Sequence, residues 1–134
     1  MNPKLTIKFL FIVPTLNAGS NIEKFSQLLL DQDYQYWRVI FVDGGSQAKD
    51  ISSLNKIIKI DKRFSLVKES NKSEGIFGAM NQGFNLAKHD EFLFFWGADD
   101  FIYNNNILNM INKNIFEKIN TVEEVDLFIF KSRY

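Results

Sequence analysis

Two kinds of apolar segment alternate along this chain, and this alternation constrains its fold more than any other feature. Short, nearly uninterrupted apolar runs of strand length recur between segments whose apolar residues repeat every three or four positions, as on one face of a helix. The runs predicted as strands cover residues 5–13, 37–42, 64–67, 91–96 and 125–130. Strands that alternate with helices predict an α/β fold, with a mostly parallel sheet and helices on both faces.

The helical segments have boundaries that the local sequence also indicates. Helical periodicity covers residues 22–29, 51–58, 76–87 and about 105–119. Ser20 or Asn21 is the expected N-cap of the first helix, because both side chains accept hydrogen bonds from helical N–H groups. Pro14 is expected to end the first strand.

Composition excludes several classes of protein. The chain has 134 residues, which argues for one domain covering 1–134. Its formal net charge is zero, whereas nucleic-acid binders usually carry a basic excess, so we expect no nucleic-acid partner. It has no cysteine and one histidine, which rules out disulfides and leaves no basis for a zinc site.

The N-terminal apolar run, residues 9–13, is too short to span a bilayer, which takes about 20 residues. A signal peptide is the alternative, since Lys4 and Lys8 precede the run. However, the run ends in Pro14 rather than in a small-residue cleavage pattern. We therefore expect a cytoplasmic protein, with peripheral association at the inner face of the membrane as the alternative.

Polar clusters follow three of the predicted strands. They are Pro14-Thr15-Leu16-Asn17, Asp43-Gly44-Gly45-Ser46 and Gly97-Ala98-Asp99-Asp100. Ligands of open parallel sheets bind outside the carboxyl ends of the strands. We therefore expect the three clusters to form one site at that edge of the sheet.

The adjacent acids Asp99 and Asp100 are the strongest candidate for chemistry. Two neighbouring carboxylates repel each other unless a cation neutralises them. Mg²⁺ and Mn²⁺ prefer oxygen ligands, often one or two carboxylates completed by water and substrate phosphates. A solvated turn or a helix N-cap is the alternative, because Asp is favoured in both. The small residues Gly97 and Ala98 favour the metal site, since they let a ligand approach the backbone.

Other segments leave alternatives open. The turn at residues 43–46 is either part of a site or an ordinary strand-to-helix turn. The glycine-rich residues 75–83 form either a phosphate cradle or a helix packed closely on the sheet, and they lack the lysine of a P-loop. Trp96 is compatible with the core and with the wall of a cleft. His89 is expected at the surface.

Taken together, the clusters resemble the donor-binding half of a family 2 glycosyltransferase with the GT-A fold. The resemblance rests on four segments in the same order, Ile12-Val13-Pro14-Thr15-Leu16-Asn17, Val42-Asp43-Gly44-Gly45-Ser46, Gly75-Ile76-Phe77-Gly78-Ala79-Met80-Asn81-Gln82-Gly83 and Trp96-Gly97-Ala98-Asp99-Asp100. It implies a Rossmann-like nucleotide-binding half without the acceptor-binding part. It also implies inverting transfer from a nucleotide-diphosphate sugar, usually UDP-linked, to an acceptor hydroxyl on a glycan or lipid-linked glycan.

The resemblance also implies roles for particular residues. Pro14, Thr15, Asn17 and Asp43 would line the nucleoside pocket, with Gly75, Ala79 and Asp99 also at the nucleotide. Asp99 and Asp100 would hold Mn²⁺ or Mg²⁺ against the diphosphate, where the metal stabilises the departing nucleotide.

The sequence departs from the family pattern at several positions, and these departures leave an alternative function open. Many relatives carry a second acid where this chain has Gly44, and Phe77 and Gly78 replace a Tyr-Asp pair. No residue is identified as the catalytic base, which lies further along the chain in that family. The alternative function is therefore a non-catalytic nucleotide-binding fragment or pseudoenzyme, completed by another chain. A response-regulator domain fits less well, because its acids follow other strands. An uncovered sheet edge predicts a homodimer.

Overall fold

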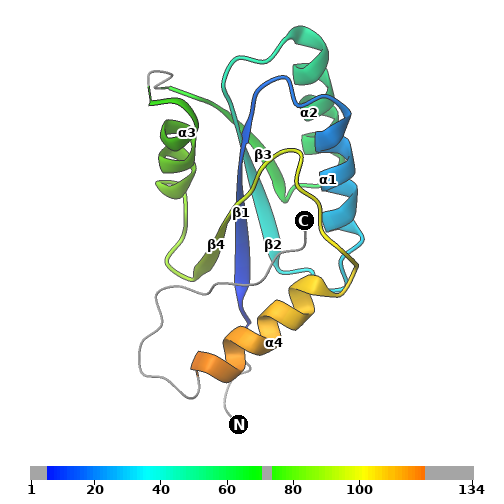
Figure 1. Ribbon diagram of the computed structural model, residues 1–134, viewed down its shortest axis with the longest axis vertical. Helices are drawn as coiled ribbons and strands as arrows, with labels where there is room; N and C mark the ends of the chain where they lie inside the picture. The colour runs from blue at the N-terminus through cyan, green and yellow to red at the C-terminus, as the bar shows by residue number, and fades with distance from the viewer. Residues whose placement is uncertain (1–5, 71–73, 120–134) are drawn as a thin grey trace.

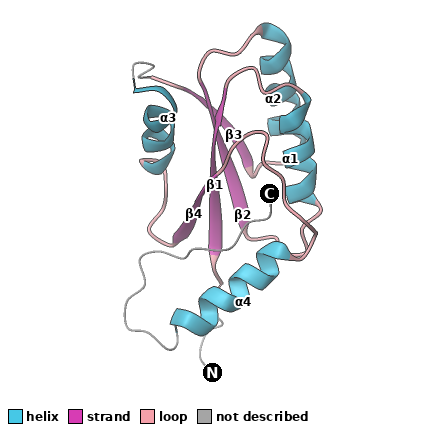
Figure 2. Cartoon of the chain, viewed as in Figure 1, coloured by secondary structure: helices cyan, strands magenta, loops and turns pink. Residues whose placement is uncertain are grey.

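A computed structural model describes residues 6–70 and 74–119 of the chain, and it contains one four-stranded sheet (Figures 1 and 2). The strands are β1 (Lys8–Thr15), β2 (Trp37–Asp43), β3 (Phe64–Lys68) and β4 (Glu91–Phe95). Their order in the sheet is β3-β2-β1-β4, and every neighbouring pair is parallel. The α/β fold with a parallel sheet, predicted from the alternating segments, is confirmed.

Helices cover both faces of the sheet. They are α1 (Ser20–Leu30), α2 (Ala48–Ile60), α3 (Gly75–Phe84) and α4 (Ile107–Ile119). Figure 1 shows α3 alone on one side of the sheet, with α1 and α2 on the other and α4 near the start of the strands. The predicted strand at residues 125–130 lies outside the described residues. None of the described helices is both long enough and apolar enough to cross a membrane.

The central strand β1 divides the core into two layers. Its odd-numbered residues Phe9, Phe11 and Val13 belong to the larger apolar cluster, which includes the inward faces of α1, α2 and α4. Its even-numbered residues Leu10 and Ile12 belong to a smaller cluster under α3. A strand buried on both faces needs an uninterrupted apolar run, which is the pattern that the sequence shows.

Pro14 lies inside β1 and does not end it, so this prediction was wrong. The oxygen of Thr15 accepts a hydrogen bond from Gly44 N at 2.8 Å, so odd-numbered residues turn their backbone groups toward β2. Ile12 turns toward β4, and its oxygen accepts from Trp96 N at 3.0 Å. Pro14 faces the same side but lies beyond the end of β4, so its missing N–H breaks no ladder bond.

The first helix begins without a side-chain cap, so the prediction of a cap by Ser20 or Asn21 was also wrong. Gly19 occupies the cap position with a φ of 58°, a left-handed conformation that glycine adopts readily. The oxygen of Ala18 accepts a hydrogen bond from Asn21 N at 3.3 Å. A tight backbone turn therefore satisfies the Asn21 N–H group at the start of the helix.

Helix α3 packs on the sheet through small residues, which favours close helix packing over a phosphate cradle for this part of the glycine-rich segment. Gly78, Ala79 and Gly83 are its buried residues. A Cβ atom on Gly83 would lie only 2.3 Å from Cγ2 of Ile12, a fully buried residue of β1. The helix can therefore approach the sheet this closely only with glycine at position 83.

We expect Gly83→Ala to lower the free energy of unfolding by about 1–3 kcal/mol, because the new methyl group overpacks a core that cannot yield. Asn81→Ala, at an exposed position of the same helix, is the matched control. Urea unfolding of both variants measures the difference. Equal stability of the two variants would show that α3 is free to move away from β1.

Arg38 of β2 and Glu91 of β4 form an ion pair that spans the central strand. Arg38 Nε lies 2.6 Å from Glu91 Oε1, and the Glu91 side chain is almost fully buried. Burial raises the pKa of Glu91, but the hydrogen bonds from Arg38 and from Lys88 N outweigh this and hold the pKa below its ordinary value. The pair therefore stabilises the fold while Glu91 is ionised.

We expect Glu91→Gln to cost about 1–3 kcal/mol of unfolding free energy at neutral pH, the range for hydrogen bonds to a charged group. Because the folded pKa is lowered, this stabilisation is complete above the unfolded pKa and is lost as the pH falls through the folded pKa. Urea unfolding across acidic and neutral pH should therefore show the gap between wild type and variant closing in acid. The same gap at all pH values would contradict the role given to the charge, and Glu23→Gln, on the exposed face of α1, is the control.

Candidate functional site

The carboxyl ends of the strands meet at one edge of the sheet, as their parallel arrangement requires (Figure 1). Residues 16–19 follow β1, residues 44–47 follow β2 and residues 96–106 follow β4. All three predicted polar clusters are therefore at this edge. The end of β3, which brings Glu69 to the same edge, was not among the predicted clusters.

Asp43 is the most fully bonded side chain at this edge. Its carboxylate accepts hydrogen bonds from Thr15 Oγ1 at 2.9 Å, from Gly45 N at 3.0 Å and from Ser46 N at 2.9 Å, and a fourth from Ser46 Oγ. Only 2% of the residue is exposed. Burial raises its pKa, but the bonds from Ser46, Thr15 and Gly45 together hold the pKa below the ordinary value. Asp43 is thus ionised and committed to shaping the turn.

Asn17 joins the loop after β1 to the loop after β2. Its N–H donates to Ser46 Oγ at 2.9 Å, and its Oδ1 accepts from Gln47 N at 2.8 Å. The backbone of Asn17 has a φ of 51°, a conformation that asparagine tolerates better than most residues. The backbone N–H and the side-chain Oδ1 of Asn17 therefore both bond the loop after β2, which makes Asn17 a positioning residue for the edge.

A pocket of about 320 Å³ opens between this edge and the start of α3. Four of the predicted nucleotide-binding residues line it, namely Pro14, Thr15, Gly75 and Ala79. Five further residues that were not predicted complete the lining, namely Leu16, Val42, Gly44, Glu69 and Ile76. Asn17 and Asp43 do not line the pocket, but their hydrogen bonds join the loops after β1 and β2 that do.

The acidic pair lies on the turn that follows β4. Asp100 N donates to Gly97 O at 3.1 Å, and Asp100 Oδ2 accepts from Gly97 N at 3.1 Å, so the turn closes on itself. Asp99 Oδ1 lies 3.2 Å and Asp100 Oδ2 2.8 Å from the place where a Cβ of residue 97 would be. Glycine at position 97 therefore allows both carboxylates to gather on one side of the turn.

Trp96 anchors this turn in the core, which answers the question that the sequence left open. Its ring packs edge-on against Phe11 at 5.7 Å and stacks on Phe25 of α1 at 6.1 Å, measured between ring centroids. The far end of the segment is held by Gln32, whose Nε2 donates to Asn104 O at 2.6 Å. Between these two anchors the segment runs beside α1 from the carboxyl edge of the sheet to the opposite edge, where α4 begins (Figure 1).

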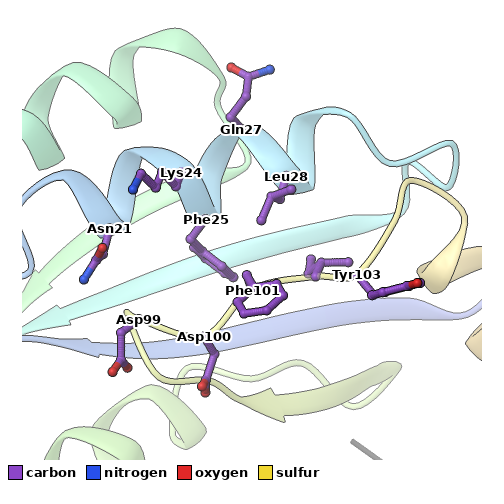
Figure 3. Close-up of a pocket in the computed structure, with 10 residues that line it drawn as sticks. Asn21, Lys24, Phe25, Gln27, Leu28, Asp99, Asp100, Phe101 and Tyr103 are labelled. Atoms are coloured by element: carbon purple, nitrogen blue, oxygen red, sulfur yellow. The ribbon is translucent and has the colours of Figure 1, made fainter. Parts of the chain in front are cut away.

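A second and larger pocket, of about 650 Å³, lies between α1 and this segment. Its lining includes Asn21, Lys24, Phe25, Gln27, Leu28, Asp99, Asp100, Phe101, Ile102 and Tyr103. Figure 3 shows Phe25 and Phe101 turned toward each other across the pocket, whereas the carboxylates of Asp99 and Asp100 point away from α1. The acids thus reach toward the face of the sheet that α3 covers, which is also the face of the smaller pocket.

The two carboxylates of the acidic pair suit a hard divalent cation whose other ligands are also oxygen atoms. Both acids are exposed, and within ranges 6–70 and 74–119 no Lys or Arg forms an ion pair with either. Among these same residues no group of three or more metal-binding side chains occurs. Two carboxylates alone match the habit of Mg²⁺ and Mn²⁺, which keep water and substrate phosphates as further ligands.

Comparison with known proteins gives a family. Residues 10–120 match the model of glycosyl transferase family 2. A glycosyltransferase of Haemophilus influenzae, itself described as uncharacterized, is 34% identical over 101 residues, which cover 75% of this chain and 40% of that protein. A PGL/p-HBAD biosynthesis glycosyltransferase of Mycobacterium bovis is 30% identical over 95 residues, covering 71% of this chain and 36% of that protein.

Solved structures agree on the fold. S. aureus TarS 1-349 in complex with UDP-GlcNAc superposes with a TM-score of 0.72 at 26% identity, covering 83% of this chain and 32% of that one. The mannosyltransferase PcManGT from Pyrobaculum calidifontis, in complex with GDP-Man and Mn²⁺, gives a TM-score of 0.66 at 24% identity, covering 79% of this chain and 32% of that one. This chain spans 40% or less of each of these proteins. Its match to the family model over residues 10–120, together with the sheet topology, shows that the chain belongs to glycosyl transferase family 2.

Proposed function

We propose that this chain binds a nucleoside-diphosphate sugar, with UDP as the nucleotide, at the carboxyl edge of its sheet. The observation that carries the proposal is that two exposed carboxylates, Asp99 and Asp100, and the smaller pocket lie at the same carboxyl edge of the sheet, with both carboxylates pointing away from α1 (Figure 3). The pocket would hold the nucleoside. The acids would hold Mn²⁺ or Mg²⁺, which binds the diphosphate.

The order of the strands supports this arrangement. The small pocket lies over the ends of β1 and β2 and beside β3, whereas the acidic turn follows β4 on the other side of β1. A ligand that fills the pocket and extends across β1 therefore meets the acids with its other end. A nucleoside diphosphate has its nucleobase at one end and its diphosphate at the other. It can therefore place the nucleobase in the apolar pocket and the diphosphate at the two carboxylates.

The comparisons support the choice of nucleotide. TarS 1-349 has been solved with UDP and with UDP-GlcNAc, at 26% identity to this chain. The Mn²⁺ complex of PcManGT concerns a protein of 24% identity, so its likeness to this chain is one of fold. The proposal of a divalent metal therefore rests on the acidic pair of this chain.

The proposed reaction is transfer of the sugar, with inversion, to an acceptor hydroxyl. A divalent cation at the acidic pair would stabilise the negative charge that develops on the departing nucleotide diphosphate. Asp99 and Asp100 would hold this cation, while the turn formed by Asp43 would keep the pocket at a fixed position relative to the acidic pair. We do not assign the base that deprotonates the acceptor to any of the described residues.

We expect UDP to bind in the presence of Mn²⁺ and to bind at least ten-fold more weakly in EDTA, because the diphosphate then faces two uncompensated carboxylates. In Asp100→Asn the dependence on metal should be lost. Isothermal titration calorimetry of the full chain measures both effects. Equal UDP affinity with Mn²⁺ and with EDTA would contradict the metal assignment.

Asp33→Asn is the matched control for this experiment. Asp33 is an exposed aspartate that follows α1, whose end lies at the opposite edge of the sheet. It should bind UDP with the affinity and the metal dependence of the wild type. If Asp33→Asn weakened binding as much as Asp100→Asn, the effect would be one of net charge and not of metal coordination.

A further inference from the structure

Glu69 stands beside Gly44 at the carboxyl edge of the sheet. Its N–H donates to Asp43 O at 2.8 Å, which continues the β2–β3 ladder past the end of β3. Neighbouring residues of parallel strands point to the same face. A Cβ on Gly44 would lie 3.0 Å from Glu69 Oε2. The carboxylate of Glu69 therefore reaches into space that a side chain at position 44 would otherwise use.

One oxygen of this carboxylate is buried without a partner. Within the described residues Glu69 Oε1 has no hydrogen bond and Glu69 forms no ion pair, while Asp43 nearby accepts four hydrogen bonds. A buried carboxylate oxygen without a donor costs free energy, and such groups in native proteins are nearly always satisfied. Glu69 lines the pocket, so a turn of its carboxylate would bring this oxygen to a donor on a ligand there.

The rest of the pocket suits a flat ring. Its lining is apolar at Pro14, Val42, Ile76 and Ala79, and among residues 6–70 and 74–119 only one acidic residue, Glu69, lines it. At about 320 Å³ the pocket is at the small end of ligand sites, which span roughly 300–1,000 Å³. It therefore fits a nucleobase better than a complete nucleotide sugar.

We propose that Glu69 selects the nucleobase of the donor by accepting a hydrogen bond from a ring N–H on its Watson–Crick edge. Uracil and guanine present such an N–H, whereas adenine and cytosine present a ring nitrogen lone pair there, which a carboxylate repels. This inference rests on the proposed binding of a nucleoside diphosphate and deepens it. It makes Glu69 a specificity-determining residue, which acts on the base and takes no part in the metal site.

The test compares UDP, GDP, ADP and CDP in titrations of the full chain with Mn²⁺. We expect the wild type to bind UDP or GDP at least ten-fold more tightly than ADP and CDP. Glu69→Ala should weaken binding of the preferred nucleotide by about 10- to 100-fold, the fold-change that one hydrogen bond to a charged group produces, and leave ADP and CDP nearly unchanged. Glu69→Gln, which keeps the shape but loses the charge, should fall between the two proteins.

A methylated nucleotide tests whether Glu69 recognises the nucleobase or only stabilises the structure. The preferred nucleotide with its ring nitrogen methylated, 3-methyl-UDP or 1-methyl-GDP, cannot donate to Glu69 and puts a methyl group against its carboxylate. The wild type should therefore bind it no more tightly than Glu69→Ala does. Glu74→Ala, at an exposed glutamate just before α3, should behave as the wild type does. Wild-type protein that binds the methylated and the unmethylated nucleotide equally would overturn the proposal without any variant.

The same titrations distinguish an error in the role of Glu69 from an error in the proposed function. If the wild type binds UDP or GDP with Mn²⁺ but neither Glu69 variant changes the preference, the donor site stands and Glu69 does not read the base. If the wild type binds none of the four nucleotides with Mn²⁺, both proposals fall.

Discussion

The carboxylate of Asp43 is the interaction on which the rest of the site depends. A charge buried to this extent is tolerated only when hydrogen bonds replace the water it has lost. Thr15 at the end of β1 and the turn through Ser46 supply those bonds, so the one charge fixes two loops from neighbouring strands. Asn17 adds a second connection between the same loops. The two loops are thus tied together by the hydrogen bonds that satisfy one buried charge.

This arrangement separates the acids of the edge by their tasks. All the hydrogen bonds of the Asp43 carboxylate lie within the fold. In the proposed complex, Glu69 on one side and Asp99 and Asp100 on the other bond the ligand. The strand order puts β3 and β4 three spacings apart, roughly 14 Å at about 4.8 Å per strand. In the proposed complex the ribose and the first phosphate cross the ends of β2 and β1, between the base at Glu69 and the metal at the acidic pair.

Sequence reasoning predicted the elements and the edge because both depend on local patterns. It misplaced the end of β1 because Pro14 is harmless only where β4 has already ended, and the relative lengths of two strands 80 residues apart are not a local property. It missed Glu69 for the same reason. Nothing beside Glu69 in the chain marks it, and only the register of β3 against β2 brings it next to Gly44. A register argument applied to all four strand ends would have found it.

Gly44 and Glu69 together explain how a departure from the family pattern is compatible with a base pocket. The family 2 pattern that the sequence resembles often has an acid where this chain has Gly44, and a side chain there would meet Glu69 Oε2 from its Cβ onward. The two carboxylates cannot share this space, because their like charges and their volumes both oppose it. A chain with glycine at position 44 can place the carboxylate of the neighbouring strand at the same point. In this chain, glycine at position 44 therefore leaves the space beside β2 to the carboxylate of Glu69.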